Sequence, residues 1–350
     1  MLTLHSEGLG YASFMNNRID ITIIEHINYE GELINNGVRY QFFKAKKGFF
    51  YLYRQTIRYI KKERPDILYV QGLVFPFQVI LLRVFLGKKY TIVVQHHGGG
   101  PFSGIKKIFQ RIADKCIDAY VFTAIGNVAP WKASGIIKKD ARCFEILEGS
   151  TDFKQQDKLL SREKINISGD PLILWVGRLN KNKDPLTVLE GFKKYVQQVP
   201  GVRLYMIYQE DDLLDEIKKY IAEDKSLQDS VYLQGKVSHE ELPYWFSAAD
   251  LFVSGSHSEG SGYALLEAMA CGCIPVVTAI PSFKKITIYG EYGYLFEPGN
   301  DESLYTALIK AGATDKEDLS KKITAHFAKE LSFNSIAEKL YRLCIKLTAK

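Results

Sequence analysis

The sequence predicts an α/β fold made of two doubly wound domains in tandem. Short apolar runs of the strand type alternate with helix-like stretches along the whole chain, a pattern typical of parallel sheets covered by helices. The length of 350 residues suits two domains of about 150 residues each. Hydrophobic residues make up 46% of the chain and charged residues 25%, as in ordinary globular proteins.

Ten strands are expected, five in each half of the chain. In the first half they span residues 19–24, 67–70, 90–94, 119–122 and 143–147. In the second half they span residues 172–176, 203–207, 231–234, 251–253 and 274–277. Helical patterns separate most of them, as at residues 186–198 and 211–223.

The domain boundary is expected in a polar, irregular stretch near residues 150–169. We therefore assign residues 1–153 to an N-terminal domain and residues 154–330 to a C-terminal domain. Residues 331–350 contain a last helical pattern, at 333–347, with apolar Ile336, Leu340 and Leu343 on one side. A helix in that position could cross back to cover the first domain.

The positive charge lies in the first half of the chain. The net charge is +6, but residues 1–150 carry +9 and the remainder carries −3. The basic residues are densest over residues 39–64, where aromatic residues are interleaved with them. On a helix starting near Phe49, an apolar stripe is expected from Phe50, Tyr53, Ile57 and Ile60. A separate basic stripe is expected from Arg54, Arg58 and Lys61.

Three interpretations of this basic segment are open. It can be a surface helix with a solvated basic face, or a peripheral contact with an anionic membrane through residues 39–64. Nucleic-acid binding is disfavoured because no recognition motif accompanies the charge.

No run reaches the ~18 apolar residues of a membrane span. An odd number of cysteines without a signal peptide indicates a reducing compartment, so we expect a cytoplasmic protein; the membrane interpretation of residues 39–64 would place its contact at the inner face of the membrane.

Residues 254–277 read SGSHSEGSGYALLEAMACGCIPVV and carry the strongest functional signal. They place Glu259 and Glu267 on either side of a glycine-rich turn and a helix start, between two apolar strands, as in a βαβ unit. Ligands bind in open α/β sheets where strand C-termini meet helix N-termini. Two carboxylates there can hold the hydroxyls of a sugar or a ribose, and glycines let the backbone approach phosphates. The stretch therefore predicts a nucleotide-sugar site.

Cys271 and Cys273 of the same stretch lack a second pair of metal ligands elsewhere in the sequence. We therefore expect them to be small buried residues that bind no metal.

A second candidate is the loop VGRLNKNKDP at residues 176–185. A strand ends at Gly177, and Asp184 with Pro185 has the composition of a helix N-cap and first turn. Arg178 and Lys183 then lie at a strand C-terminus beside a helix N-terminus. Two cations there suit a diphosphate, although the loop could also be a solvated basic turn.

Two weaker signals lie in the first half. His96 and His97 end a strand and precede three glycines, so one of them is placed to meet a ligand, while neighbouring histidines do not suit a shared metal. Gly8 and Gly10 could belong to a dinucleotide fingerprint, but the preceding strand is very short. A glycine loop near donor phosphates, through Gly10, is the better use, and a plain turn is the alternative.

Together, these motifs resemble the glycosyltransferase family 4 enzymes. The resemblance rests on VGRLNKNKD (176–184), AADLFV (248–253), SHSEGSGYALLEAMACGCIPVV (256–277) with its E-x7-E pattern, and GYLFEPG (293–299). It is looser in the first half, at HHGG (96–99), ADKCIDAYVFTA (113–124) and EILEGSTDF (145–153). The resemblance implies the GT-B fold, in which two Rossmann-like domains face each other across a cleft. The residues 208–211, Tyr-Gln-Glu-Asp, depart from the glycine-rich turn usual in the family.

The resemblance also implies roles for individual residues. Arg178 and Lys183 would bind the donor diphosphate and stabilise the leaving group, Glu267 would hold the ribose, and Glu259 would contact the donor sugar. His97 would meet the sugar or the reacting centre from the other domain. The remaining donor contacts would come from Gly260, Ser261 and Gly262 through their backbone, from Gly10, and from Val237 with Lys236 beside the nucleobase. The catalytic set would be Glu259, His97, Arg178 and Lys183, with no metal.

The implied activity is that of a retaining hexosyltransferase (EC 2.4). It would move a sugar from a UDP- or GDP-sugar to a glycan, a lipid-linked acceptor or a small molecule, in cell-surface polysaccharide biosynthesis, without a cofactor. One alternative is a GT-B sugar-nucleotide epimerase, for which the sequence shows no acid–base carboxylate pair in the first domain. Another is a non-catalytic sugar-nucleotide-binding subunit, which would be expected to lack the charged motif residues that are present here. A dehydrogenase would rest only on the weak glycine match.

Overall fold

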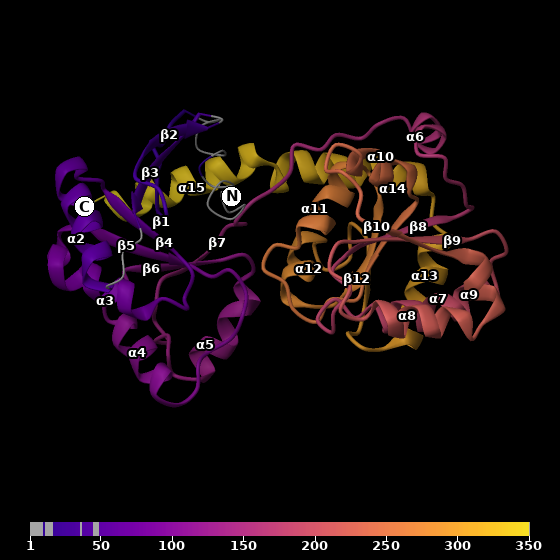
Figure 1. The fold of residues 1–350 in the computed structure, drawn as a ribbon, viewed down its shortest axis with the longest axis horizontal. Coiled ribbons are helices and arrows are strands. Elements are labelled where there is room, and N and C mark those ends of the chain that lie inside the picture. The colour runs from indigo at the N-terminus through magenta and orange to yellow at the C-terminus, as the bar shows by residue number, and fades with distance from the viewer. Residues whose placement is uncertain (1–9, 11–16, 36, 45–48, 350) are drawn as a thin grey trace. The chain divides into compact units, whose positions relative to one another are not determined.

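The computed structural model describes residues 10, 17–35, 37–44 and 49–349, with the backbone alone at 49–53 (Figure 1). Contacts between residues divide the chain into two compact units. Unit 1 comprises residues 1–149 together with 333–350, and unit 2 comprises residues 150–332. Among the described helices, none is both long enough and apolar enough to cross a bilayer.

Unit 1 contains a small sheet near its N-terminal end. Its strands are β1 (Thr22–Ile27), β3 (Val38–Lys44) and β2 (Gly31–Asn35), in that spatial order. β1 pairs with β3 in parallel, and β2 pairs with β3 in antiparallel orientation. Val38, Tyr40 and Phe42 are buried on one face, beside Ile23. The predicted strand at 19–24 therefore begins three residues later, and the hairpin of β2 and β3 was not predicted.

A second, fully parallel sheet forms the body of unit 1. Its order is β4 (Ile67–Gln71), β5 (Thr91–Gln95), β6 (Ala119–Phe122) and β7 (Cys143–Glu145), which confirms the four remaining strand predictions for this half. Alternate side chains of these strands enter one core with side chains of four helices. The helices of this region are α2 (Phe49–Glu63), α3 (Pro76–Leu86), α4 (Gly104–Asp114) and α5 (Ala129–Ala133), with the short turns η1 (Gly87–Lys89) and η2 (Ile125–Val128).

The last helix, α15 (Phe333–Thr348), is grouped with unit 1. Arg18 Nη1 donates to Glu338 Oε2 at 2.9 Å, and the Arg18 guanidinium lies over the Tyr341 ring. Lys346 lies over the ring of Phe144 in β7, with its Nζ 5.0 Å from the ring centroid. These contacts join the C-terminal end of the chain to unit 1.

Unit 2 is a six-stranded parallel sheet. In spatial order its strands are β10 (Val231–Gly235), β9 (Arg203–Tyr208), β8 (Leu172–Gly177), β11 (Leu251–Ser254), β12 (Ile274–Thr278) and β13 (Tyr294–Phe296). Numbered from β8, this is the order 3-2-1-4-5-6 of a doubly wound nucleotide-binding sheet, and its topological switch point lies between β8 and β11. All five strands predicted for this half are present, and the three-residue β13 is an addition.

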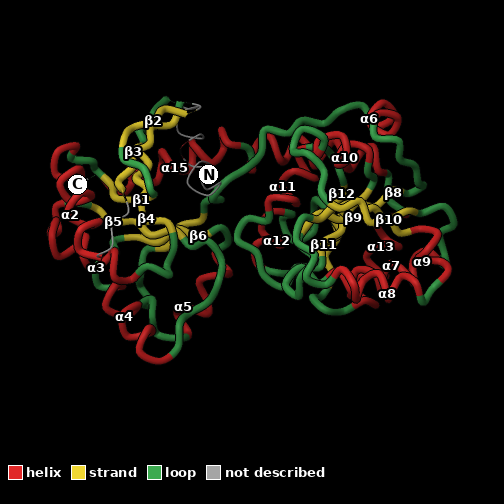
Figure 2. The backbone as a smooth tube through the Cα atoms, in the orientation of Figure 1, coloured by secondary structure: helices red, strands yellow, loops and turns green. Residues whose placement is uncertain are grey.

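Helices cover both faces of this sheet (Figure 2). One layer contains α7 (Pro185–Val196), α8 (Leu214–Ala222), α9 (Lys225–Ser230) and α13 (Asp301–Gly312). The other contains α6 (Lys158–Lys164), α10 (Leu242–Ala248), α11 (Tyr263–Ala270) and α14 (Lys316–His326), and the chain also forms α12 (Pro281–Ile286) and a π-helical turn, η3 (Phe327–Leu331). Two-sided cover explains why the sheet strands are apolar on both faces.

Candidate functional site

The switch point of unit 2 brings two loops together. The first follows β8 and runs to the start of α7, and the second follows β11 and runs to the start of α11. His257 N donates to Asn182 O at 2.8 Å, and Asn182 Nδ2 donates to Ser258 O at 3.0 Å. These reciprocal bonds make the two motif loops predicted from the sequence a single structural element.

Glycine at two positions permits this arrangement. A Cβ on Gly255 would lie 2.8 Å from the carbonyl oxygen of Asp184 and 3.2 Å from that of Lys183, so a side chain there would push the loops apart. Gly262, directly before α11, has φ +68° and faces the ring of Phe283. That backbone conformation is strained for residues with a Cβ.

Lys183 and Glu259 meet across the two loops. Lys183 Nζ forms a short ion pair with Glu259 Oε1, and both side chains are mostly buried. The sequence predicted both residues for one site, and the structure brings them together. Because a partly buried charge is stabilised by its partner, each holds the other in place when no donor is bound.

Asp184 organises the start of α7 beside this pair. As N-cap it accepts hydrogen bonds from Thr187 N at 3.3 Å and Thr187 Oγ1 at 2.8 Å. His257 Nε2 lies 2.9 Å from its Oδ2. The N-terminus of α7, where the helix dipole favours anions, is thus fixed next to Lys183.

Arg178 has a different partner. It is exposed, and its Nη1 lies 3.5 Å from Glu210 Oε2, while Leu179 N donates to the Glu210 carbonyl at 2.9 Å. Glu210 belongs to the segment after β9 that departs from the glycine-rich turn of the family. The sequence analysis gave Glu210 no role. The only feature that could have pointed to it is the replacement of the family's glycine-rich turn by residues 208–211.

Glu267 lies in the second turn of α11. Loss of water around its carboxyl raises the pKa of Glu267 to about 8. At neutral pH the group is therefore mostly protonated and can both donate and accept a hydrogen bond. Such a group suits the vicinal hydroxyls of a ribose, which also donate and accept.

The other predicted donor contacts lie at the carboxyl edge of the same sheet. Gly260 and Ser261 belong to the loop between β11 and α11, with Ser261 buried. Val237 follows β10 by two residues and is half-buried, next to the exposed Lys236. These residues follow strands of one parallel sheet, at the edge where doubly wound folds bind ligands.

His96 and His97 have different surroundings. His96 is buried, stacks on Phe122 and pairs through Nε2 with the carbonyl of Gly99 at 3.1 Å. Burial lowers the pKa of His96 below its ordinary value. His97 Nδ1 makes a short contact with Oε2 of the buried Glu148. Glu148 lies in the family-like segment 145–153, but the sequence alone did not indicate this contact.

Gly10 packs on the small sheet of unit 1. A Cβ at this position would lie 2.7 Å from Val38 Cγ1 and 3.1 Å from Ile23 Cδ1. Gly8 and the other residues of the predicted fingerprint lie outside the described residues. The structure therefore explains the need for glycine at position 10 by packing, and the donor contact stays a prediction.

The cysteines are structural. Cys271 and Cys273 are free and buried at the end of α11 and the start of β12. Burial raises the pKa of the Cys271 thiol to about 12, so it stays protonated. In the described part of the chain, no three His, Cys, Asp or Glu side chains are grouped as metal ligands would be.

Known proteins resemble the part of the chain that contains the two motif loops. The model of the family described as "Glycosyl transferases group 1" matches residues 157–325, which include both motif loops. Mannosylfructose-phosphate synthase of Agrobacterium fabrum is 29% identical over 191 residues, covering 52% of this chain and 42% of that protein. GDP-mannose:cellobiosyl-diphosphopolyprenol alpha-mannosyltransferase of Xanthomonas campestris is 34% identical over 238 residues, covering 66% and 60%. The chain thus spans about half the length of the curated relatives it matches.

Solved structures resemble the whole chain. A glycosyltransferase from Rickettsia africae has a TM-score of 0.77 at 16% identity, covering 97% of this chain and 94% of that chain. Sucrose-phosphate synthase from Thermosynechococcus elongatus has a TM-score of 0.73 at 19% identity, covering 97% and 92%. Anabaena HepE in complex with UDP-glucose has a TM-score of 0.69 at 15% identity, covering 89% and 87%. These likenesses confirm the predicted GT-B fold.

Proposed function

We propose that this chain, whose residues 157–325 match the model of the glycosyl transferases group 1 family, is a hexosyltransferase (EC 2.4) that uses a nucleotide-sugar donor. The observation that carries the proposal is the ion pair of Lys183 with Glu259 at the switch point of unit 2. It joins a cation suited to a phosphate and a carboxylate suited to a sugar hydroxyl. We propose family 4 as the subgroup, on the motifs of residues 176–184 and 256–277.

Donor binding would exchange the partners of this pair. A diphosphate beside the N-terminus of α7 would attract Lys183 and, from the exposed loop, Arg178. Glu259 would then be released to accept a hydroxyl of the donor sugar. As the sugar–phosphate bond breaks, negative charge builds on the leaving phosphate, and the two cations would stabilise it without a metal.

The proposal also covers the stereochemistry of the transfer and the substrates. We propose transfer with retention of the anomeric configuration, from a UDP- or GDP-sugar to a glycan, lipid-linked or small-molecule acceptor, in cell-surface polysaccharide synthesis on the cytoplasmic side. Support for the donor class comes from the names of relatives: one uses GDP-mannose, and Anabaena HepE was solved with UDP-glucose. His97, oriented by Glu148, is proposed to contact the sugar.

One observation keeps a second function open. The contact of His97 with Glu148 gives unit 1 an imidazole and a carboxylate side by side, which the sequence did not indicate. An epimerase of sugar nucleotides needs acid–base groups of this kind. It would convert the donor without transferring its sugar to an acceptor.

The test is a screen of UDP-, GDP-, ADP- and CMP-sugars, with and without candidate acceptors, followed by proton NMR of the products. We expect release of one nucleoside diphosphate, an unchanged anomeric configuration in the product, and full activity in EDTA. Lys183→Ala should abolish release, while Lys181→Ala, an exposed lysine of the same loop, should not. Interconversion of two nucleotide sugars without release would favour the epimerase, and a strict need for a divalent cation would contradict the mechanism.

A further inference from the structure

An apolar surface of unit 1 is exposed on two neighbouring helices. Five large side chains form it, with these exposed fractions: Phe75 46%, Phe77 45%, Ile105 71%, Ile108 54% and Ile112 42%. The isoleucines recur at the spacing of one helix face on α4, and the phenylalanines lie at the start of α3. We call these five residues the α3–α4 face. Apolar groups gathered in this way mark binding surfaces more often than isolated exposed residues do.

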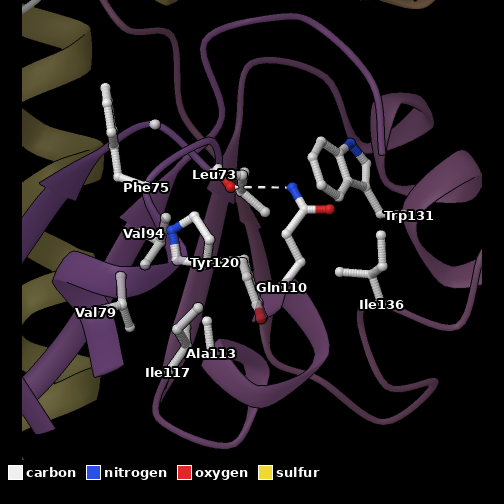
Figure 3. Close-up of a pocket in the computed structure, with 12 residues that line it drawn as sticks. Leu73, Phe75, Val79, Val94, Gln110, Ala113, Ile117, Tyr120, Trp131 and Ile136 are labelled. Atoms are coloured by element: carbon white, nitrogen blue, oxygen red, sulfur yellow. Dashed lines mark hydrogen bonds between the residues drawn. The ribbon is translucent and has the colours of Figure 1, made fainter. Parts of the chain in front are cut away.

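The α3–α4 face rests on an ordered base. On the inner side of α4, Gln110, Ala113 and Asp114 are buried. Gln110 Nε2 donates to the carbonyl of Leu73 at 3.3 Å, across a small apolar pocket between the helices (Figure 3). The rings of Phe77 and Phe109 are 4.3 Å apart and join α3 to α4. The isoleucines are therefore held outward, since the opposite side of the helix is fixed in the core.

The stretch of chain that forms this face is basic. Between Asp66 and Asp114 the sequence contains no acidic residue. The same stretch holds six basic residues, namely Arg83, Lys88, Lys89, Lys106, Lys107 and Arg111. Arg83 is mostly buried and pairs with Asp118 at 2.6 Å, so the other five provide the charge at the surface. Asp114 is buried and accepts a hydrogen bond from Tyr120 Oη at 2.7 Å, so it does not offset the charge at the surface. The α3–α4 face thus shares α4 with Lys106, Lys107 and Arg111, and Lys88 and Lys89 follow the end of α3.

We propose that the α3–α4 face docks on the surface of an anionic phospholipid bilayer. The isoleucines and phenylalanines would enter the boundary between headgroups and acyl chains, and the lysines would contact anionic headgroups. A second copy of the chain fits less well, because a symmetric contact would place these basic residues opposite one another.

This surface differs from the segment 39–64 predicted to contact membranes. In α2, Ile57 and Ile60 are buried in the core of unit 1, so this part of the apolar stripe is not available to lipid. Arg54, Arg58 and Lys61 are exposed, so among the side chains of α2 that the structure describes, from residue 54 on, the exposed ones are charged. The apolar part of a membrane contact would come from α3 and α4. The proposal uses no residue of the donor site and is independent of the proposed reaction.

The experiment is co-sedimentation of the full chain with vesicles of phosphatidylcholine, with or without about 30% phosphatidylglycerol. We expect binding to the anionic vesicles only, weakened by high salt. Ile105→Gln/Ile108→Gln should weaken binding at least about tenfold, given the apolar area removed from the contact. The matched control is Leu159→Gln/Leu160→Gln, which changes two equally exposed leucines of α6 in unit 2.

A second variant tests the charge separately. Lys88→Gln/Lys89→Gln/Lys106→Gln keeps the apolar residues and should reduce both the affinity for anionic vesicles and its dependence on salt. Circular dichroism of each variant checks that the fold is kept. Equal binding of all variants, or equal binding to both kinds of vesicle, would overturn the proposal. So would a dimer in light scattering that dissociates in the isoleucine variant, because the face would then bind a second copy.

Discussion

The two carboxylates of the donor motif differ in their surroundings although they lie eight residues apart. Glu259 pairs with Lys183, whereas Glu267 loses water without gaining a cation, and its pKa rises to about 8. Two residues with the same chemistry thus have different surroundings in one motif. The difference leads to a prediction about the pH dependence of stability.

Glu267→Gln should stabilise the protein increasingly as the pH rises. The wild-type carboxyl stays protonated in the folded state up to about pH 8 but ionises near 4.5 when unfolded. The folded state therefore binds more protons in this window, and its free energy of unfolding falls as the pH rises. Urea unfolding at several pH values should show the variant gaining up to about 1.4 kcal/mol per pH unit between these limits. If the variant and the wild type differed in free energy of unfolding by the same amount at every pH, the carboxyl of Glu267 would not be buried as the structure shows.

Glu148 is predicted to position His97. Because Glu148 is buried and contacts Nδ1, replacing it should let the imidazole turn. Glu148→Gln should lower kcat/KM for sugar transfer by about 10-fold to 100-fold, an effect typical of residues that orient a reacting group. The control is Asp140→Asn, an exposed carboxylate of the same unit. Unchanged kcat/KM together with an unchanged NMR signal of the His97 ring would show that Glu148 has no such role.

At the scale of elements, the site depends on how closely two loops approach. Gly255→Ala would place a methyl group 2.8 Å from the carbonyl of Asp184 and force the loops after β8 and β11 apart. We expect a loss of about 1–3 kcal/mol in the free energy of unfolding, as for other overpacked sites, and weaker binding of nucleotide. Gly100→Ala is the control, since nothing lies within 4 Å of its added Cβ. Equal effects of the two substitutions would refute the tight loop contact.

The elements of unit 2 could be predicted because they are apolar and bounded by turn residues. Its strands β8, β9, β11 and β12 are largely buried and read as nearly continuous apolar runs. The hairpin of β2 and β3 was missed because its strands are rich in charged and polar residues, although Asn36-Gly37 is a hairpin signal. The three residues of β13 are too few for a periodic pattern.

The contacts of the site were harder to predict than its members. Lys183 and Glu259 were assigned to one site from their motifs, but their ion pair joins residues 76 positions apart. Glu148 lies 51 positions from His97 in the chain, and no pattern in the sequence links them. Pairs of this kind arise from the order of strands in a sheet, which the sequence specifies only through the whole fold.

At the scale of the whole molecule, units 1 and 2 differ in net charge and in their similarity to the family model. The family model covers residues 157–325 and thus lies inside unit 2, where the site residues of the donor motif are found. Residues 1–150 hold the basic excess and the α3–α4 face. We accordingly propose that unit 2 binds the donor and that unit 1 contacts the membrane.

The central claim, that the joined loops of unit 2 bind a nucleotide diphosphate through Lys183, is tested most directly by isothermal titration. UDP and GDP are titrated into the wild type, Lys183→Ala, and the loop control Lys181→Ala. We predict that one nucleotide binds the wild type and the control alike, and that Lys183→Ala weakens its binding at least about tenfold, as expected for a lost charge-assisted contact. Equal affinity of all three proteins for that nucleotide would contradict the claim.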